Sequence, residues 1–266
     1  MNQSYQWVEE LRERRKGKWI GGEILFFPEV DSTNRRAREQ CLRGAGEGTV
    51  VLAESQAEGK GRMSRQWQSP PGINVYASII LRPSFSPVSA PQIPLVAGVA
   101  GANALARATG LEARIKWPND IFVHGKKVGG VLSEMEAEGS RVRFIILGVG
   151  LNVNWRHEDI PPDLREIATS LRAEAGREFS RAEVAAEFLE ELEREYALFL
   201  KDRFSSRLRE EWNRLSWVNR KWVTITMMEK KFEGQVLGLD TDGALLVMGR
   251  EGKIQRFIAG DVSLRL

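Results

Sequence analysis

The sequence predicts an α+β fold in which helices pack on a mixed or largely antiparallel sheet, followed by a small all-β unit. Three observations predict it. Segment 113–154 is typical of successive strands joined by the turns "HGKK" and "AEGS". Segment 93–110 is an apolar run with small residues at helical spacing. After Asn219, short β-rich runs recur about every 8–12 residues, and "DTDGA" is a clear turn between two of them.

The first half of the chain alternates helices and strands. A short helix with one apolar face should end near Gly17, and the strand "EILFFPEV" should stop at Pro28. The next helix begins at "DSTN", where Ser32 supplies N-cap chemistry, and ends at Gly44. The strands "TVVLAES" and "INVYASIILRP" then flank a basic loop.

The second half begins with the apolar helix, which should end at Gly110, and continues with the strands of 113–154. An apolar stripe from Val184 to Phe199 predicts a longer helix, and a second helix should follow as far as Trp217. We therefore expect one domain over 1–217 and an SH3-like β-barrel over 218–266.

Composition excludes several classes of function. The formal net charge of +3 is too small to indicate nucleic-acid binding by itself. One cysteine and two distant histidines make a disulfide, a zinc site or a histidine triad hard to build. The N-terminus lacks a signal-peptide core, and the apolar run Ile93–Ala106 is shorter than the ~20 residues of a membrane span. We expect a cytoplasmic protein without membrane contact.

The basic loop 59–67, "GKGRMSRQW", predicts an anion-binding site. Its glycines let backbone N–H groups approach a ligand closely. Lys60, Arg62 and Arg65 supply positive charge, and arginine can hold a phosphate or carboxylate at two points. Trp67 offers a flat face for a purine or a cation. The alternative is a solvated surface loop whose tryptophan packs in the core.

The stretch "KWPNDIFVHGKKVGG" contains a second group of polar residues. Pro118 forces the preceding residue away from helical geometry, so Asn119 and Asp120 begin a strand. One Asp with few other protein ligands suits Mg²⁺ that is also held by substrate phosphates. Lys127 follows a hairpin, beside two glycines. An ordinary turn and a solvated hairpin tip are the alternatives.

The stretch "LGVGLNVN" interrupts an apolar strand with Gly148 and Gly150. Glycine inside a strand often marks the close approach of backbone or ligand. Asn152 and Asn154 lie two residues apart and share one face. A bulge with exposed amides explains the pattern nearly as well.

The chain resembles biotin protein ligases over roughly Glu23–Leu266 in the order and spacing of five motifs. These motifs are "DSTN", "AESQAEGKGRMSRQW", "KWPNDI", "KKVGGVLSE" and "GVGLNVN". The resemblance implies a class II synthetase-like catalytic domain and a short form that lacks an N-terminal DNA-binding domain. It implies that ATP and Mg²⁺ activate biotin as biotinyl-5'-AMP. Biotin then passes to one lysine of a biotin carboxyl carrier protein, an acetyl-CoA carboxylase subunit. No DNA binding is expected, and the choice between monomer and homodimer is left open.

The resemblance also implies roles for individual residues. Those expected at biotin are Ser32, Thr33, Asn34, Gln56, Lys60, Gly61, Arg62, Lys127, Gly130 and Gly148. Those expected at ATP and the adenylate are Arg62, Arg65, Trp67, Asn119, Lys127, Gly150 and Asn152. The catalytic cations would be Lys127, Arg62 and Lys116, and Asp120 would bind the metal.

Two positions depart from the family's usual loop, G-R-G-R-x-G-R. Lys60 keeps the charge but loses the guanidinium fork, and Ser64 replaces a glycine, which should modestly reduce the freedom of the loop.

Three other functions compete with this interpretation. A lipoate ligase or octanoyltransferase would share the fold, but "KWPND" and "GKGRMSR" argue against it. A nucleic-acid-binding β-barrel is disfavoured by the small net charge. A sensor without turnover would not need Lys127, Arg62 and Asp120.

Overall fold

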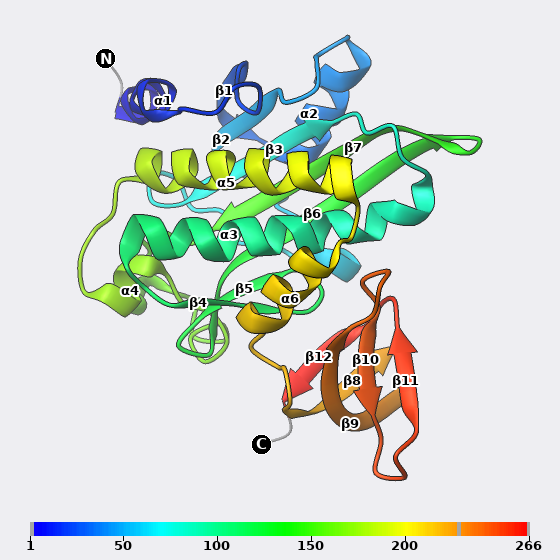
Figure 1. Ribbon diagram of the computed structural model, residues 1–266. Coiled ribbons are helices and arrows are strands. Elements are labelled where there is room, and N and C mark those ends of the chain that lie inside the picture. The colour runs from blue at the N-terminus through cyan, green and yellow to red at the C-terminus, as the bar shows by residue number, and fades with distance from the viewer. Residues whose placement is uncertain (1–2, 228–229, 265–266) are drawn as a thin grey trace.

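The computed structural model describes residues 3–227 and 230–264, and Figure 1 shows helices packed on a large sheet with a smaller sheet at the C-terminal end. The helices are α1 (Gln3–Arg14), α2 (Thr33–Leu42), α3 (Ile93–Thr109), α4 (Leu171–Ala175), α5 (Arg181–Asp202) and α6 (Ser206–Leu215). Three 3₁₀ turns are η1 (Arg62–Ser64), η2 (Pro87–Gln92) and η3 (His157–Asp159).

The large sheet has seven strands in the order β1-β2-β3-β7-β6-β5-β4. These strands are β1 (Ile24–Val30), β2 (Val50–Gln56), β3 (Val75–Leu81), β4 (Ala113–Lys116), β5 (Asp120–Val123), β6 (Lys126–Glu138) and β7 (Arg141–Leu151). β1 and β2 are parallel and the other neighbours are antiparallel, which confirms the predicted mixed sheet.

The smaller sheet, here called the C-terminal barrel, is antiparallel in the order β11-β10-β9-β8-β12. Its strands are β8 (Trp222–Met227), β9 (Lys230–Leu239), β10 (Leu245–Met248), β11 (Ile254–Phe257) and β12 (Asp261–Leu264). The predicted all-β unit is therefore present, whereas the domain boundary at 217/218 stays a prediction.

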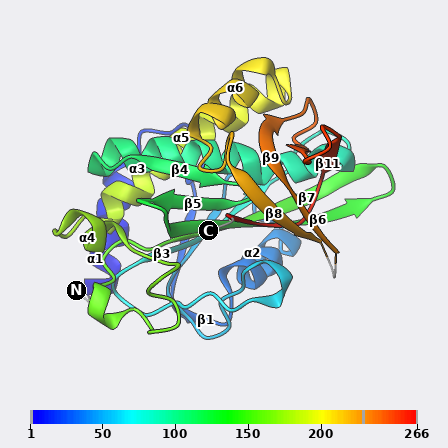
Figure 2. The same cartoon turned by 90° about the horizontal axis from the view of Figure 1, so that it is seen from below.

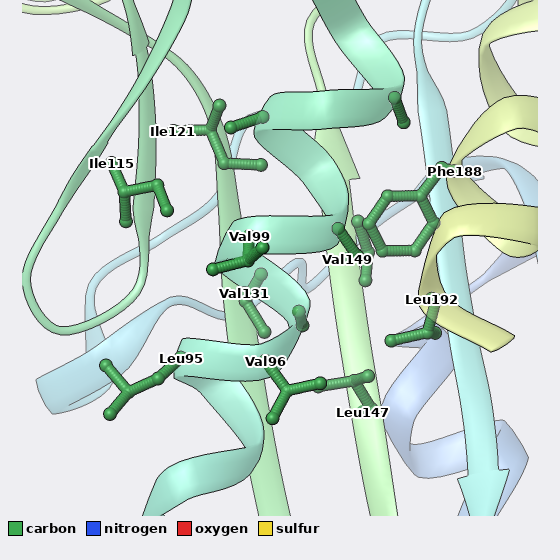
Figure 3. Close-up of a cluster of buried hydrophobic side chains, with 14 of the residues drawn as sticks. Leu95, Val96, Val99, Ile115, Ile121, Val131, Leu147, Val149, Phe188 and Leu192 are labelled. Atoms are coloured by element: carbon green, nitrogen blue, oxygen red, sulfur yellow. The ribbon is translucent and has the colours of Figure 1, made fainter. Parts of the chain in front are cut away.

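Helices cover both faces of the large sheet. Figure 2 shows α3 and α5 on one side and α2 on the other. The side chains between α3, α5 and the sheet form the main core (Figure 3). Those labelled in the figure are Leu95, Val96, Val99, Ile115, Ile121, Val131, Leu147, Val149, Phe188 and Leu192. This core fixes which face of each strand remains free for a ligand.

Helix α3 is the most apolar element of the chain. Together with η2 it makes a helical stretch, Pro87–Thr109, that is long and apolar enough to cross a membrane by length and composition alone. This stretch is longer than the sequence suggested because η2 precedes the apolar run. Its most apolar window is 72% buried inside the protein, as expected for a core helix. A Cβ atom on Gly101 would lie 2.4 Å from Ile121 Cδ1, so glycine lets α3 lie close to the sheet.

Strand β1 continues through Pro28, contrary to the prediction that proline would stop it. Phe27 pairs with Ala53, and Glu29 pairs with Ser55, on either side of the proline. β1 is an edge strand, so an N–H missing from its open side costs no ladder hydrogen bond. The first two helices also end slightly earlier than expected, at Arg14 and Leu42.

Candidate active site

A cavity of about 590 Å³ lies on the face of the sheet opposite α3, between the start of α2, the basic loop and the C-terminal barrel. The side chains of Val131 and Val149 point toward α3 (Figure 3). Because successive residues of a strand face opposite sides of the sheet, the neighbouring glycines of β6 and β7 lie on the cavity side. Every residue to which the family resemblance gave a role lines this one cavity, whereas Asn154 does not line it and pairs with the backbone of Phe179. The lining residues with such a role are Ser32, Thr33, Asn34, Gln56, Lys60, Gly61, Arg62, Arg65, Trp67, Lys116, Asn119, Asp120, Lys127, Gly130, Gly148, Gly150 and Asn152.

Gly130 and Gly150 form the floor of the cavity. Since they carry no side chain, the Trp67 ring packs directly on them. A Cβ atom on Gly150 would lie 2.5 Å from Trp67 Cε2, and one on Gly130 would lie 3.3 Å from Cζ3. Lys127 Nζ lies 5.2 Å from the centroid of the Trp67 ring. The Trp67 indole N–H is buried and has no hydrogen-bond partner among the described residues. The glycines thus place an aromatic ring and an ammonium group side by side.

One end of the cavity is lined by uncharged polar groups around Asn34, and the Glu134 carboxylate, outside the lining, anchors this side chain. A Cβ atom on Gly148 would lie 2.2 Å from Asn34 Oδ1, so only glycine leaves room for this side chain. Asn34 Nδ2 donates to Glu134 over 2.6 Å, and Ser78 Oγ donates to Asn34 Oδ1 over 2.6 Å. Ser78 was not predicted, although a single serine among the large side chains of the strand "VYASIIL" is a signal that could have found it.

The network continues from Thr33 to Gln56. The Thr33 backbone N–H and hydroxyl both donate to Gln56 Oε1, over 2.9 and 3.0 Å, and Gln56 Nε2 donates to Ser69 Oγ over 2.9 Å. Ser32 occupies the N-cap position of α2, but its side chain makes no capping hydrogen bond. Gln56 satisfies one of the free N–H groups of this helix end instead. The buried hydroxyls and amides suit a neutral, hydrogen-bonding ligand.

The basic loop is a closed hairpin over the cavity. The Gly61 N–H donates to the Arg65 carbonyl over 2.7 Å, and the Trp67 N–H donates to the Gly59 carbonyl over 2.8 Å. Met63 and Ser64 have φ values of 55° and 60°, in the left-handed region. Ser64 therefore occupies a conformation that glycine adopts more easily, which gives a physical meaning to its departure from the family pattern.

The two arginines of the hairpin contact the C-terminal barrel. Arg62 donates to Asn119 Oδ1 over 3.2 Å and to the Gly260 carbonyl over 3.3 Å. Arg65 forms an ion pair with Asp261, the first residue of β12. Asp261 was not predicted, because a charge pair between segments 196 residues apart leaves no mark on local spacing.

Two lysines approach the cavity from strands β4 and β6, which lie on either side of β5. Lys127 Nζ lies 2.7 Å from Asp120 Oδ1 in an ion pair. Lys116 Nζ lies 5.2 Å from the centroid of the Phe122 ring. Desolvation of the partly buried Lys116 side chain lowers the pKa of its ammonium group; Asp120 opposes this shift, and the nearby charge of Lys127 adds to it.

A strap, residues 161–169, closes the cavity beside Lys127. The Lys127 N–H donates to the Ile167 carbonyl over 2.9 Å, and the Thr169 N–H donates to the Lys127 carbonyl over 2.8 Å. Asn152 Nδ2 donates to the Thr169 carbonyl over 2.9 Å, so this amide group holds the strap as well as lining the cavity. The strap was not predicted, because it pairs as an isolated bridge without a strand pattern.

The described residues contain no cluster of three or more Asp, Glu, His or Cys side chains that could hold a metal by themselves. The carboxylate of Asp120 beside the lysines fits a different case, an ion held mainly by substrate phosphates. Asp120 remains the predicted protein ligand for Mg²⁺, whose chemistry there would be to neutralise phosphate charge.

Comparisons with known proteins agree with one another. Residues 26–152 match the Biotin/lipoate A/B protein ligase family, and residues 221–265 match the Biotin protein ligase C terminal domain. The bifunctional ligase/repressor BirA of Bacillus subtilis is 37% identical over 260 residues, covering 96% of this chain and 78% of the relative. The biotin–[acetyl-CoA-carboxylase] ligase of Mycobacterium tuberculosis is 34% identical over 189 residues, covering 69% of this chain and 68% of the relative. Among solved structures, biotin protein ligase from Aquifex aeolicus in complex with biotin and ATP has a TM-score of 0.80 and 31% identity, covering 92% of this chain and 99% of that one.

Proposed function

This chain belongs to the biotin protein ligase family, and we infer from that membership that it joins biotin to subunits of biotin-dependent carboxylases at the expense of ATP. It is a ligase whose substrates are biotin and ATP. The family match at residues 26–152 covers lipoate ligases as well. The match of residues 221–265 to the biotin ligase C-terminal domain, and the relatives' biotin specificity, favour biotin over lipoate or octanoate.

The observation that carries the function is the convergence of five cations on one cavity. Lys60, Arg62 and Arg65 come from the basic loop, Lys116 ends β4, and Lys127 lies near the start of β6. Joining a carboxylate to a nucleotide brings two anions together. Preorganised cations in a partly closed site stabilise that encounter most strongly.

The reaction has two steps. A carboxylate oxygen of biotin attacks the α-phosphorus of ATP, so that an acyl C–O–P linkage forms and pyrophosphate leaves. The amine of the acceptor lysine then attacks the acyl carbon, AMP leaves, and the amine gives up a proton as the amide forms. The protein's main tasks in the second step are to orient the amine and exclude water.

We assign the two ends of the cavity by their chemistry. The neutral network of Ser32, Thr33, Asn34 and Gln56 suits the uncharged ring system of biotin. Arg65, Trp67 and Asn119 would face the nucleotide. Lys127, which lies beside Trp67 and Gly130, would contact the biotin carboxylate and the α-phosphate together with Arg62 and Lys116.

We propose that the acceptor of biotin is a biotin carboxyl carrier domain. We propose that α1 does not read DNA, because Trp7, Val8 and Leu11 bury its apolar face in the core. A homodimer through an edge of the large sheet would use β1, since the Trp217 N–H already donates to Ile115 on the other edge strand, β4. A cytoplasmic location without membrane contact also remains a proposal.

The test is the exchange of pyrophosphate into ATP in the presence of an added carboxylic acid, measured with biotin, lipoate and octanoate in parallel. Of the three acids, we expect only biotin to support exchange. Biotin should then be transferred to a carboxyl carrier domain. Exchange with lipoate or octanoate but not with biotin would contradict the proposed function.

A further inference from the structure

Asp261 lies among cations that the proposed function assigns to phosphate. Arg65 pairs with its Oδ2, and Arg62 Nη1 lies 3.9 Å from its Oδ1. The Asp261 carboxylate also acts on the pKa of Lys116, which it raises against the effect of burial. A side chain from the C-terminal barrel thus supplies negative charge where phosphate oxygens are expected.

The charges that line the cavity show why this acid matters. Among the described lining residues there are five cations but two carboxylates, Asp120 and Asp261. Asp120 pairs with Lys127 over 2.7 Å. Asp261 is therefore the carboxylate that offsets the mutual repulsion of Arg62 and Arg65.

We propose that Asp261 is a positioning residue that holds Arg62 and Arg65 over the cavity until the phosphates of ATP replace it. This inference rests on the proposed function. Carboxylate and phosphate oxygens bind the guanidinium group in the same way, so one anion can replace the other without re-aiming the arginines. The basic loop would then meet ATP already folded across the cavity.

The geometry allows this exchange at small cost. The Arg65 side chain is 66% exposed, so water screens its pair with the partly buried Asp261, and the second contact, to Arg62, is a long one of 3.9 Å. The strand that carries Asp261 stays in place, because its next residue, Val262, pairs with Ile225 of β8. Only the side-chain contacts need to change.

The test is direct calorimetry of ATP binding to Asp261→Asn, which removes the competing charge without changing the size of the side chain. We expect ATP to bind about two- to fivefold tighter, the range for releasing a largely exposed ion pair. Biotin binding should be unchanged, and Asp261→Glu should return ATP affinity to the wild-type value. Asp261→Ser provides a second neutral variant if Asp261→Asn does not fold.

Asp240→Asn is the matched control, since Asp240 pairs with Arg256 in the same barrel and does not line the cavity. It should leave ATP affinity unaltered. Unchanged or weaker ATP binding by Asp261→Asn, or an equal gain in the control, would overturn the proposal. Because binding is measured without turnover, failure of biotin-dependent exchange in the wild type would count against the proposed function alone.

Discussion

Lys127 combines three contacts that prepare it to act as a fixed cation. Its Nζ pairs with Asp120 over 2.7 Å, it lies near Trp67, and its backbone is held by the strap. We predict that Lys127→Met lowers kcat/KM for biotin activation by about 10²–10³-fold, the usual effect of removing one preorganised group that stabilises developing charge. Pyrophosphate exchange at limiting biotin measures this loss.

The neighbouring lysine is the control for that prediction. Lys126 Nζ donates to the Arg165 carbonyl over 2.7 Å and does not line the cavity. Because Arg165 lies in the strap, Lys126→Met shows what loosening the strap alone costs; it removes no charge from the cavity and should change kcat/KM by less than about threefold. A similar loss in both variants would show that Lys127 acts through the fold and not through the substrates.

Lys116 should set the alkaline limit of the reaction. Burial lowers the pKa of its ammonium group, so it loses its charge at a lower pH than an ordinary lysine, which titrates near ~10.4. Below this lowered pKa the cation is present and the rate is full; above it the rate falls. We predict that Lys116→Arg, which stays charged, moves the alkaline limb of the pH profile of kcat/KM upward. An unmoved limb would exclude Lys116 as its source.

At the scale of elements, strand β7 presents two glycines to opposite ends of the cavity. A Cβ atom on Gly148 would lie 2.2 Å from Asn34 Oδ1, and one on Gly150 would lie 2.5 Å from the Trp67 ring. We predict that Gly148→Ala raises KM for biotin about tenfold or more while Gly150→Ala does the same for ATP, because each displaces a different side chain. Steady-state kinetics with each substrate varied in turn measures the two effects.

A third glycine, Gly46, provides the control for replacing glycine by alanine at a position without a close neighbour. A Cβ atom on Gly46 would meet no other described residue within 4 Å, so Gly46→Ala should leave both KM values unchanged. Equal effects of Gly148→Ala and Gly150→Ala on both substrates would contradict the assignment of a biotin end and a nucleotide end.

Most elements could be predicted because apolar periodicity, glycine and turn residues act locally. Helix α3 ends at Thr109, and Gly110, with a φ of 76°, is its left-handed cap, as the sequence indicated. The prediction at Pro28 was wrong because proline tolerance depends on the position of the strand in the sheet, and that position is a tertiary property.

The candidate site was predictable where chemistry is concentrated in short motifs, and not elsewhere. The loop 59–67 and Lys127 carry their polar groups in recognisable runs. Ser78 lies alone in an apolar strand, and Asp261 meets Arg65 only after the barrel packs beside the loop. Contacts of this kind depend on the assembled fold and have no local pattern.

At the scale of the whole molecule, the C-terminal barrel and the large sheet are physically continuous. The main hydrophobic core includes Val223 and Leu245 of the barrel together with Leu95 of α3. Trp117 Nε1 donates to the Gly243 carbonyl over 3.4 Å, and Gln92 Nε2 donates to the Asp242 carbonyl over 3.1 Å. Removing the barrel would therefore expose core surface as well as take Asp261 from the cavity.

This continuity predicts that the chain unfolds in a single cooperative transition, because neither part retains a complete core without the other. Biotin and ATP together, each at about 100 times its dissociation constant, should raise the Tm of that whole transition by about 5 °C or more, since they bind only the folded cavity. Differential scanning calorimetry with and without the substrates measures both effects. Two separate transitions, of which the substrates shift just one, would show that the barrel folds independently of the site it helps to form.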